Sequence, residues 1–199
     1  PPAAASERDG GNEVVVPGNG GVLYAGRPGG SPLLAGSPSG SFAMTAAWSR
    51  SAPTLGNLDG DADLEIVLTD VNGNLHAWNR DGTPLPGFPK SYGVSFLNSP
   101  VLGDVDGDGD LEIVAIHESG ANNLHCLRGD GSELGGFPVN VTLKSTSGVS
   151  PTPALADLDA DGKLEILIGS NDYVPTNSKL YVLRWNGTVY PGWPQLTGL

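Results

Sequence analysis

The most constraining feature of this chain is an acidic segment that occurs three times with nearly the same sequence and flanks. The copies read LGNLDGDADLEIV from Leu55, LGDVDGDGDLEIV from Leu102 and LADLDADGKLEIL from Leu155. Consecutive copies therefore begin about 50 residues apart, a period that is typical of repeat architectures. In such proteins each period is one supersecondary unit that packs against its neighbours. We therefore expect an array of similar units.

A fourth, degraded copy lies at the start of the chain, in PPAAASERDGGNEVVV, where Glu13 takes the place of the closing acid. The similarity also continues beyond the acidic segments. Each is followed by a short apolar stretch (VLYAG, NLHAW, NLHCL or KLYVL). Three copies then have an Asp-Gly or Asn-Gly turn and a Gly-Phe-Pro or Gly-Trp-Pro motif. We interpret residues 1–199 as one repeat domain with approximate periods 1–50, 51–98, 99–148 and 149–199.

Each period predicts four strands. The second strand follows the acids, the third is the NLHAW-type stretch and the fourth follows the Gly-Phe-Pro motif. Asp-Gly and Asn-Gly favour hairpins because they accept positive φ angles, and no helical periodicity competes with this interpretation. The first strands are expected at 53–58, 100–105 and 153–158, and the second strands at 64–69, 111–116 and 164–169.

Four antiparallel strands in each repeated period predict an all-β fold made of four-stranded β-propeller blades. Propellers have about four to eight blades. Four repeats therefore either close into a ring or belong to a larger propeller, and we favour the larger propeller.

The acidic segments have the donor pattern of a calcium loop. In residues 104–112, Gly109 at the sixth position allows the chain to wrap, and the backbone carbonyl of Asp110 at the seventh can join the ligand shell. Ca²⁺ takes about six to eight oxygen ligands, which suits this all-oxygen set. The side-chain donors at the first, third, fifth and ninth positions are Asp104, Asp106, Asp108 and Glu112.

The other copies repeat the pattern with few changes, so the sequence predicts about three structural Ca²⁺ sites. The first copy has Ala5 at the first position and loses a ligand, and we expect it to bind weakly or not at all. The donors are Asn57, Asp59, Asp61, Glu65 and the carbonyl of Asp63 in copy two; Asp157, Asp159, Asp161, Glu165 and the carbonyl of Lys163 in copy four; and Glu7, Asp9 and Glu13 in the first copy.

Two alternatives account for the acids less well. An EF-hand needs a Glu at the twelfth position, where the third copy has Ala115, and it needs helical flanks. Ordinary acidic turns are the second alternative, since Asp and Gly favour turns in any case. Five carboxylates within nine residues of the third copy would repel one another without a cation, however, and this favours calcium.

These loops resemble those of the FG-GAP/VCBS repeat family, whose β-propellers include the head of the integrin α subunit. Residues 104–112 and 157–165 match the family loop D-x-D/N-x-D-G-x-x-D, and 57–65 match it with Asn first. The resemblance implies that Ca²⁺ is bound by the side chains at positions one, three, five and nine and by the carbonyl at position seven.

Two departures from the family pattern are visible. This chain has Glu at position nine throughout, whose longer side chain can still reach a cation with one or both oxygens. Ser-Pro-Val-Leu-Gly, from Ser99, replaces the Phe-Gly…Gly-Ala-Pro signature, so the resemblance is closer to the bacterial VCBS-type repeats.

The overall charge narrows the classes of partner. The chain has 22 acidic and 10 basic residues, a formal net charge of −12, which repels the phosphate backbone of nucleic acids. No run approaches the ~18 consecutive apolar residues of a membrane-spanning helix. We therefore expect neither a nucleic-acid partner nor a membrane span.

A ligand-binding face is expected on the side opposite the calcium loops. The loops there differ most in length among the copies, and loops that vary on a constant scaffold often carry function. The alternative is that the longer loops are tolerated insertions. The candidate residues, from the connector after the second period and from the long loop of the fourth, are Tyr92, Phe96, Asn98, Asn171, Asp172 and Tyr173.

The sequence contains no catalytic motif such as G-x-S-x-G, H-E-x-x-H or a P-loop. His76 and His125 occupy one repeat position, where the other copies have Tyr24 and Tyr181. This alternation favours a packing role over catalysis. We therefore expect a binding or structural module and not an enzyme.

The resemblance and the calcium loops together predict a secreted or cell-surface module, extracellular or periplasmic, that binds a protein or a glycan in adhesion. A shared fold does not fix one activity, so two alternatives stay open. One is an accessory or scaffold portion of a secreted polysaccharide-active enzyme. The other is a structural stalk or filament subunit.

Overall fold

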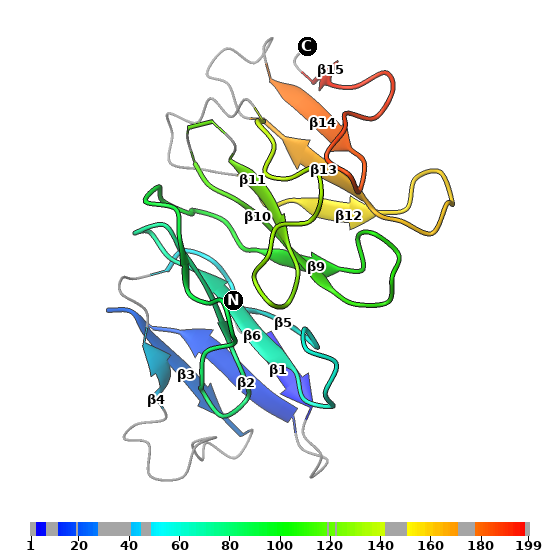
Figure 1. The fold of residues 1–199 in the computed structure, drawn as a ribbon. Helices are drawn as coiled ribbons and strands as arrows, with labels where there is room; N and C mark the ends of the chain where they lie inside the picture. Colours follow the sequence, from blue (N-terminus) through cyan, green and yellow to red (C-terminus); the bar gives the residue numbers. More distant parts are fainter. Residues whose placement is uncertain are drawn as a thin grey trace.

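The computed structural model describes residues 3–6, 12–18, 20–27, 41–44, 49–118, 120–121, 123–141, 151–170 and 178–197. None of these residues forms a helix, and the strands are all antiparallel, which confirms the predicted all-β fold. The described part of the chain accordingly contains no helix long and apolar enough to cross a membrane. The strands form four sheets, one from each repeat (Figure 1). We number the sheets one to four in chain order.

The first strands of sheets two to four have three residues each, fewer than expected. Each begins directly after a proline, which has no N–H to donate, and each ends two residues early, where its acidic loop begins. The fourth strand of sheet three is reduced to a bridge between Leu124 and Val139. The strands are β1 (Ala3–Ser6), β2 (Asn12–Pro17), β3 (Val22–Gly26) and β4 (Ser41–Met44) in sheet one; β5 (Thr54–Gly56), β6 (Glu65–Thr69), β7 (Asn74–Trp78) and β8 (Lys90–Ser91) in sheet two; β9 (Val101–Gly103), β10 (Glu112–Ile116) and β11 (Leu124–Leu127) in sheet three; and β12 (Ala154–Ala156), β13 (Glu165–Gly169), β14 (Lys179–Leu183) and β15 (Gln195–Leu196) in sheet four.

The hairpin between β6 and β7 shows how the sequence specifies a turn. Asp70, directly after β6, accepts hydrogen bonds from the N–H groups of Asn72 and Asn74 at 2.9 and 3.0 Å. Gly73 supplies the positive φ of 87° that this tight turn requires. The buried carboxylate of Asp70 also lies 3.0 Å from the ring of His76. The turn is therefore tied to the strand that follows it.

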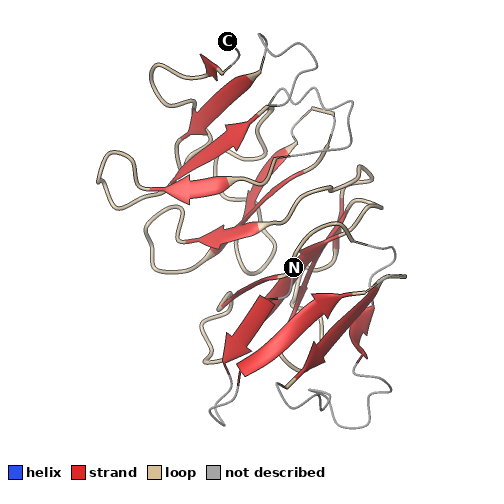
Figure 2. Cartoon of the chain, turned by 180° about the vertical axis from the view of Figure 1, so that it is seen from behind, coloured by secondary structure: helices blue, strands red, loops and turns tan. Residues whose placement is uncertain are grey.

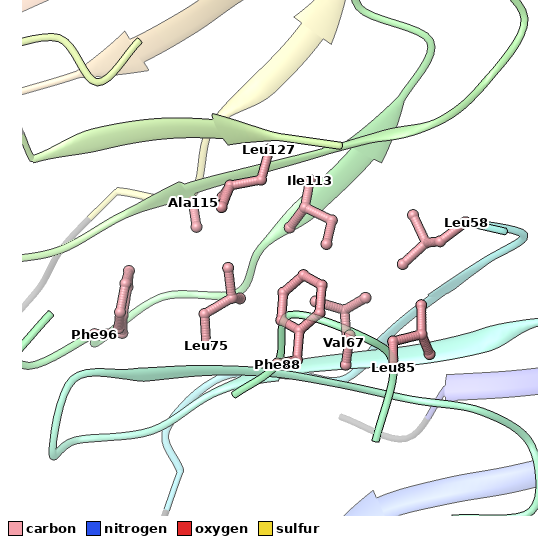
Figure 3. Close-up of a cluster of buried hydrophobic side chains, with 10 residues drawn as sticks. Leu58, Val67, Leu75, Leu85, Phe88, Phe96, Ile113, Ala115 and Leu127 are labelled. Carbon is pink, nitrogen blue, oxygen red and sulfur yellow. The ribbon is translucent and has the colours of Figure 1, made fainter. Parts of the chain in front are cut away.

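Apolar side chains pack between successive sheets, and alternate residues of each second strand point to opposite neighbours. In β10, Ile113 and Ala115 belong to the cluster shared with sheet two, whereas Val114 and Ile116 belong to the cluster shared with sheet four. Figure 3 shows the first of these clusters, in which side chains of sheets two and three face one another. Sheet three is thus covered on both faces, which explains its continuous apolar run.

The first strands of successive sheets lie side by side, since β1 contacts β5, β5 contacts β9 and β9 contacts β12. Glycines permit this approach: a Cβ on Gly56 or Gly103 would lie 2.7 Å from a leucine Cδ1 of the next sheet. The sheets fan out from this shared edge, as the blades of a propeller do. Sheets one and four lie at opposite ends of the molecule, so the described residues form an open array and not a closed ring (Figure 1).

Candidate metal centre

Three acidic loops lie along one side of the molecule, each between the first and second strands of its sheet (Figures 1 and 2). We call residues 57–65 loop two, 104–112 loop three and 157–165 loop four. In each loop, one oxygen from each of three carboxylates lies within 4.8 Å of the other two. Each loop therefore holds a compact group of acids. The groups are Asp59, Asp61 and Glu65; Asp104, Asp106 and Asp108; and Asp157, Asp159 and Glu165.

The ninth-position glutamates have the same role in all three loops. Glu65, Glu112 and Glu165 are each 1% exposed. The Oε2 atom of each accepts a hydrogen bond from the N–H at the second position of its loop, at 2.7, 2.7 and 2.9 Å. One oxygen therefore closes the loop, and Oε1 takes no part in that hydrogen bond. This arrangement favours binding of a metal ion through one oxygen of each glutamate, not two.

Two backbone features also recur. The fifth-position Asp accepts a hydrogen bond from the N–H of the seventh residue, at 2.6, 3.0 and 2.9 Å in loops two, three and four. The fourth position has a positive φ in all three loops, at Gly60 (80°), Gly107 (76°) and Ala160 (59°). The sixth position has one only in loops three and four. The sequence predicted the turn at the sixth position and missed the fourth, because loop four has alanine there.

Several carboxylate oxygens of these loops are buried without a partner. Oε1 of Glu65, Oδ1 of Asp104 and Oδ1 of Asp106 have no hydrogen bond within the described part of the chain. An unsatisfied buried polar group costs about 1–3 kcal/mol, and more when it is charged. A hard divalent cation removes this cost and the repulsion between the carboxylates, because such cations bind oxygen ligands. The residues present therefore fit a cation of the Ca²⁺ type.

The proton affinity of the loops points the same way. Burial raises the pKa of Glu112 to about 7, although the hydrogen bond from Val105 opposes this, and the nearby Asp106 and Asp108 carboxylates raise it further. Burial likewise raises the pKa of Glu65, with a contribution from Asp59 and Asp61. The ionised carboxylates of these loops therefore destabilise the metal-free fold, and a bound cation would offset their burial and mutual repulsion.

Some predicted donors have other partners. Asn57 turns toward its own loop, where its amide donates to the carbonyl of Asp61 and its Oδ1 accepts the N–H of Gly60 at 2.8 Å. Glu112 and Asp161 fall outside the compact acid group of their own loops. The seventh residues are Asp63, Asp110 and Lys163. Their N–H groups are fixed by the hydrogen bonds to the fifth-position Asp described above.

The weak first copy falls largely outside the described residues. Glu7 and Asp9 lie in the undescribed part of the chain, and Glu13 lies in β2 with its side chain undescribed. Its predicted weak binding therefore stays a prediction.

The candidate ligand face divides into two parts. Phe96 is 0% exposed and lies in the cluster between sheets two and three (Figure 3). Asn98 is also buried, and its amide donates to the carbonyl of Pro151 at 2.8 Å. These two side chains are buried in the packing of the connectors, whereas Tyr92 is half-buried, and the predicted ligand face stays a prediction. Asn171, Asp172 and Tyr173 lie outside the described residues.

The histidines are buried among other side chains. His76 stacks on Trp78 with ring centroids 4.9 Å apart, and it contacts Asp70. His125 Nδ1 lies 2.7 Å from Glu133 Oε1, and its ring lies beside that of Tyr92, at 4.1 Å between centroids. Their burial agrees with the packing role expected from the His/Tyr alternation.

Two solved structures that match with TM-scores above 0.5 agree with this fold. The chain is similar to BamB from Moraxella catarrhalis, with 17% identity over 99% of this chain and 49% of that chain, at a TM-score of 0.58. It is also similar to BBS1N in complex with ARL6DN, with 13% identity over 95% of this chain and 49% of that chain, at a TM-score of 0.56. The V. cholerae biofilm matrix protein Bap1 matches with 20% identity over 94% of this chain and 36% of that chain, at a TM-score of 0.43. The chain thus spans half or less of the length of each of these structures.

Comparison of the sequence with family models identifies the loops directly. No curated protein sequence matches the chain significantly. A family model described as an FG-GAP-like repeat matches residues 57–115 and 104–168. The two matches together contain all three acidic loops and extend over more than half of the chain. The chain belongs to the FG-GAP-like repeat family.

Proposed function

We propose that this chain is a calcium-stabilised portion of an extracellular β-propeller that binds a protein or glycan partner and has no enzymatic activity of its own. The observation that carries the proposal is the compact acid group of each loop, together with the buried, unpartnered carboxylate oxygens of loops two and three. Such oxygens are costly in a metal-free protein and useful in a calcium-bound one. Membership of the FG-GAP-like repeat family supports the same reading.

Calcium is the proposed ion because the donors are all oxygens and because extracellular modules bind it with dissociation constants of about 10⁻⁴–10⁻³ M. At ~10 mM free Ca²⁺, each such site adds about 1.4 to 2.7 kcal/mol to the free energy of unfolding. Three ions would also offset about half of the net charge of −12.

The test is thermal unfolding in chelator, in Ca²⁺ and in Mg²⁺ at equal concentration. We expect a large rise in Tm with Ca²⁺ and a small one with Mg²⁺, which prefers a stricter octahedral shell. The double variant Asp104→Asn, Asp106→Asn should lose roughly a third of the calcium-dependent gain, since it disables one of three loops. An identical melting curve in Ca²⁺ and in chelator would refute the proposal.

The larger propeller is supported by side chains that are exposed at one end of the array but buried inside it. Val14, Val16 and Tyr24 of sheet one are 39%, 39% and 37% exposed. The residues at the same repeat positions in sheet two, which face sheet one, are Ile66, Leu68 and His76, at 3%, 1% and 6%.

The far end of the array shows the same contrast. Leu158 in loop four is 49% exposed, whereas its equivalents Leu58 and Val105 are 7% and 0% exposed. Both outer faces are thus built like the inner ones, and we propose that further sheets of this kind cover them in the complete protein.

Self-association provides a test of these faces. In the isolated chain, we expect concentration-dependent association in light scattering, because the outer apolar faces meet one another. Val16→Glu should reduce this association, whereas Val189→Glu should not, because Val189 lies on the hairpin after β14 and its equivalent Pro84 is exposed in the interior sheet too. Equal association of the two variants would contradict the assignment of these faces.

Partner binding is tested with the calcium-loaded chain immobilised against a panel of purified polysaccharides and surface proteins. Binding that disappears in chelator is the expected result. Release of new reducing ends from a polysaccharide would instead identify an enzyme and overturn the non-enzymatic part of the proposal.

A further inference from the structure

Loops three and four are joined by one lysine. Lys163, at the seventh position of loop four, donates a hydrogen bond from Nζ to the backbone carbonyl of Asp106 in loop three, at 2.8 Å. Its ammonium also lies 3.9 Å from the centre of the Trp185 ring, a cation–π distance that holds the side chain in place. The side chain of Lys163 thus reaches from loop four to loop three.

The backbones of these two loops are also in contact. The N–H of Leu164 donates to the carbonyl of Val105 at 3.1 Å. A Cβ on Gly107 would lie 2.9 Å from the carbonyl oxygen of Gly162, so the loops approach closely where Gly107 has its left-handed turn. The backbones of loops three and four therefore meet at two points.

Loops two and three lack the corresponding bridge. The seventh residue of loop three is Asp110, whose carboxylate has no proton to donate to a carbonyl of loop two. A Cβ on Gly60, the equivalent of Gly107, would meet no atom within 4 Å. The space beside loop three on this side is instead a pocket of about 210 Å³. Leu58, Asp110 and Arg128 are among the residues that line it.

We propose that Lys163 is a positioning residue that couples calcium binding in loops three and four, while loop two binds independently. This inference rests on the proposed calcium binding. The Asp106 carboxylate would help to hold a cation in loop three, and this would fix the Asp106 carbonyl as the acceptor for Lys163. Because the backbone of Lys163 belongs to loop four, fixing its side chain pre-orders that loop and lowers the ordering cost of the second ion.

The coupling is measured by calorimetric titration with Ca²⁺ on the whole chain with chosen loops disabled. Loop two is disabled by Asp59→Asn with Asp61→Asn, loop three by Asp104→Asn with Asp106→Asn, and loop four by Asp157→Asn with Asp159→Asn. The affinity of each loop alone is compared with the affinity of loops three and four together, and of loops two and three together. A coupling factor follows for each pair, and the pair of loops two and three is the matched control.

We expect binding in loop three to strengthen binding in loop four by at least about fivefold, the lower range of typical coupling between sites. The pair of loops two and three should show less than about a twofold effect. Lys163→Met should reduce the coupling of loops three and four to that of the control pair. Lys163→Arg, which keeps a donor and a charge, should retain most of it.

The outcomes separate this inference from the proposed function. If no loop takes up Ca²⁺, the proposed function fails. If the loops bind Ca²⁺ but the two pairs show equal coupling, or Lys163→Met leaves the coupling unchanged, only the role of Lys163 is overturned. A circular dichroism spectrum of metal-free Lys163→Met that matches the parent chain shows that lost coupling does not come from misfolding.

Discussion

The junction between loops two and three differs from the junction between loops three and four, although the three loops share one acid spacing. At the first junction, the hairpin after β11 places Gly129 directly against the carbonyl of Leu58, and a pocket lies beside it. At the second, the equivalent hairpin residue is Trp185, and Lys163 crosses to the neighbouring loop. The strands are arranged alike at both junctions, but two positions differ: Lys163 replaces Asp110, and Trp185 replaces Gly129. These differences leave a pocket at the first junction and form a bridge at the second.

This difference shows where a repeat protein can vary without loss of its fold. The strands, their register and the ninth-position glutamates must stay the same, because each sheet packs on the next. A side chain at a loop junction, such as Lys163, contacts only one neighbouring sheet. They can therefore determine whether adjacent metal sites act together.

The largest expected effect comes from a substitution at the first junction, at Gly129. A Cβ on Gly129 would lie 1.9 Å from the carbonyl oxygen of Leu58, so Gly129→Ala must displace backbone on one side. We expect a loss of about 3 kcal/mol in the free energy of unfolding, measured by denaturant titration.

Gly135, in the same hairpin, provides the control, because a Cβ there would meet no atom within 4 Å. Gly135→Ala should change stability by less than about 0.5 kcal/mol. Similar losses in the two alanine variants would show that the close approach at Leu58 does not constrain this junction.

The second prediction concerns the pH dependence of loop three, which both junctions share. Burial first, and then the neighbouring carboxylates, raise the pKa of Glu112 from 4.5 to about 7 in the metal-free fold. Because the folded state holds this proton more tightly than the unfolded state, the contribution of Glu112 to metal-free stability is largest below about pH 4.5 and is lost as the pH rises to about 7. Calcium must displace the proton, so its affinity for this loop should fall about tenfold per pH unit below about 7.

Glu112→Gln tests this prediction without a change of pH. The glutamine oxygen can still accept the N–H of Val105 but carries no charge. In chelator at pH 8, this variant should melt at a higher temperature than the parent chain, and in Ca²⁺ it should gain less. A lower melting temperature in chelator would contradict the inference that the Glu112 charge destabilises the metal-free fold.

The smallest expected effect comes from a substitution in loop four, at the second junction. Ala160 has a φ of 59°, a conformation that costs a residue with a Cβ about 1–2 kcal/mol. Ala160→Gly should therefore stabilise the chain by about 1 kcal/mol, seen as a rise in Tm in chelator and in Ca²⁺ alike. The reverse change in loop two, Gly60→Ala, should destabilise by a similar amount, since Gly60 has a φ of 80° and an open surround.

Most of the strands and loops could be predicted from the sequence because they depend on local patterns. The short apolar runs and the Asp-Gly turns specify hairpins, and the spacing of acids specifies loops whose carboxylates converge. The backbone turn at Ala160 could not be predicted, since alanine seldom adopts a positive φ and no glycine marks the position. The burial of Phe96 was missed for another reason: a connector residue is covered only when the next sheet packs over it.

The sequence by itself determined that the chain is an array of four all-β repeats with three acid-rich loops, because periodicity and turn chemistry act over a few residues. Only the tertiary structure decided which loops touch. Lys163 and Asp106 are 57 residues apart in the chain, and the sequence contains no pattern that pairs them. Their contact exists because sheets three and four pack through Ile116, Ile166 and their neighbours, which brings one loop within a side chain's length of the next.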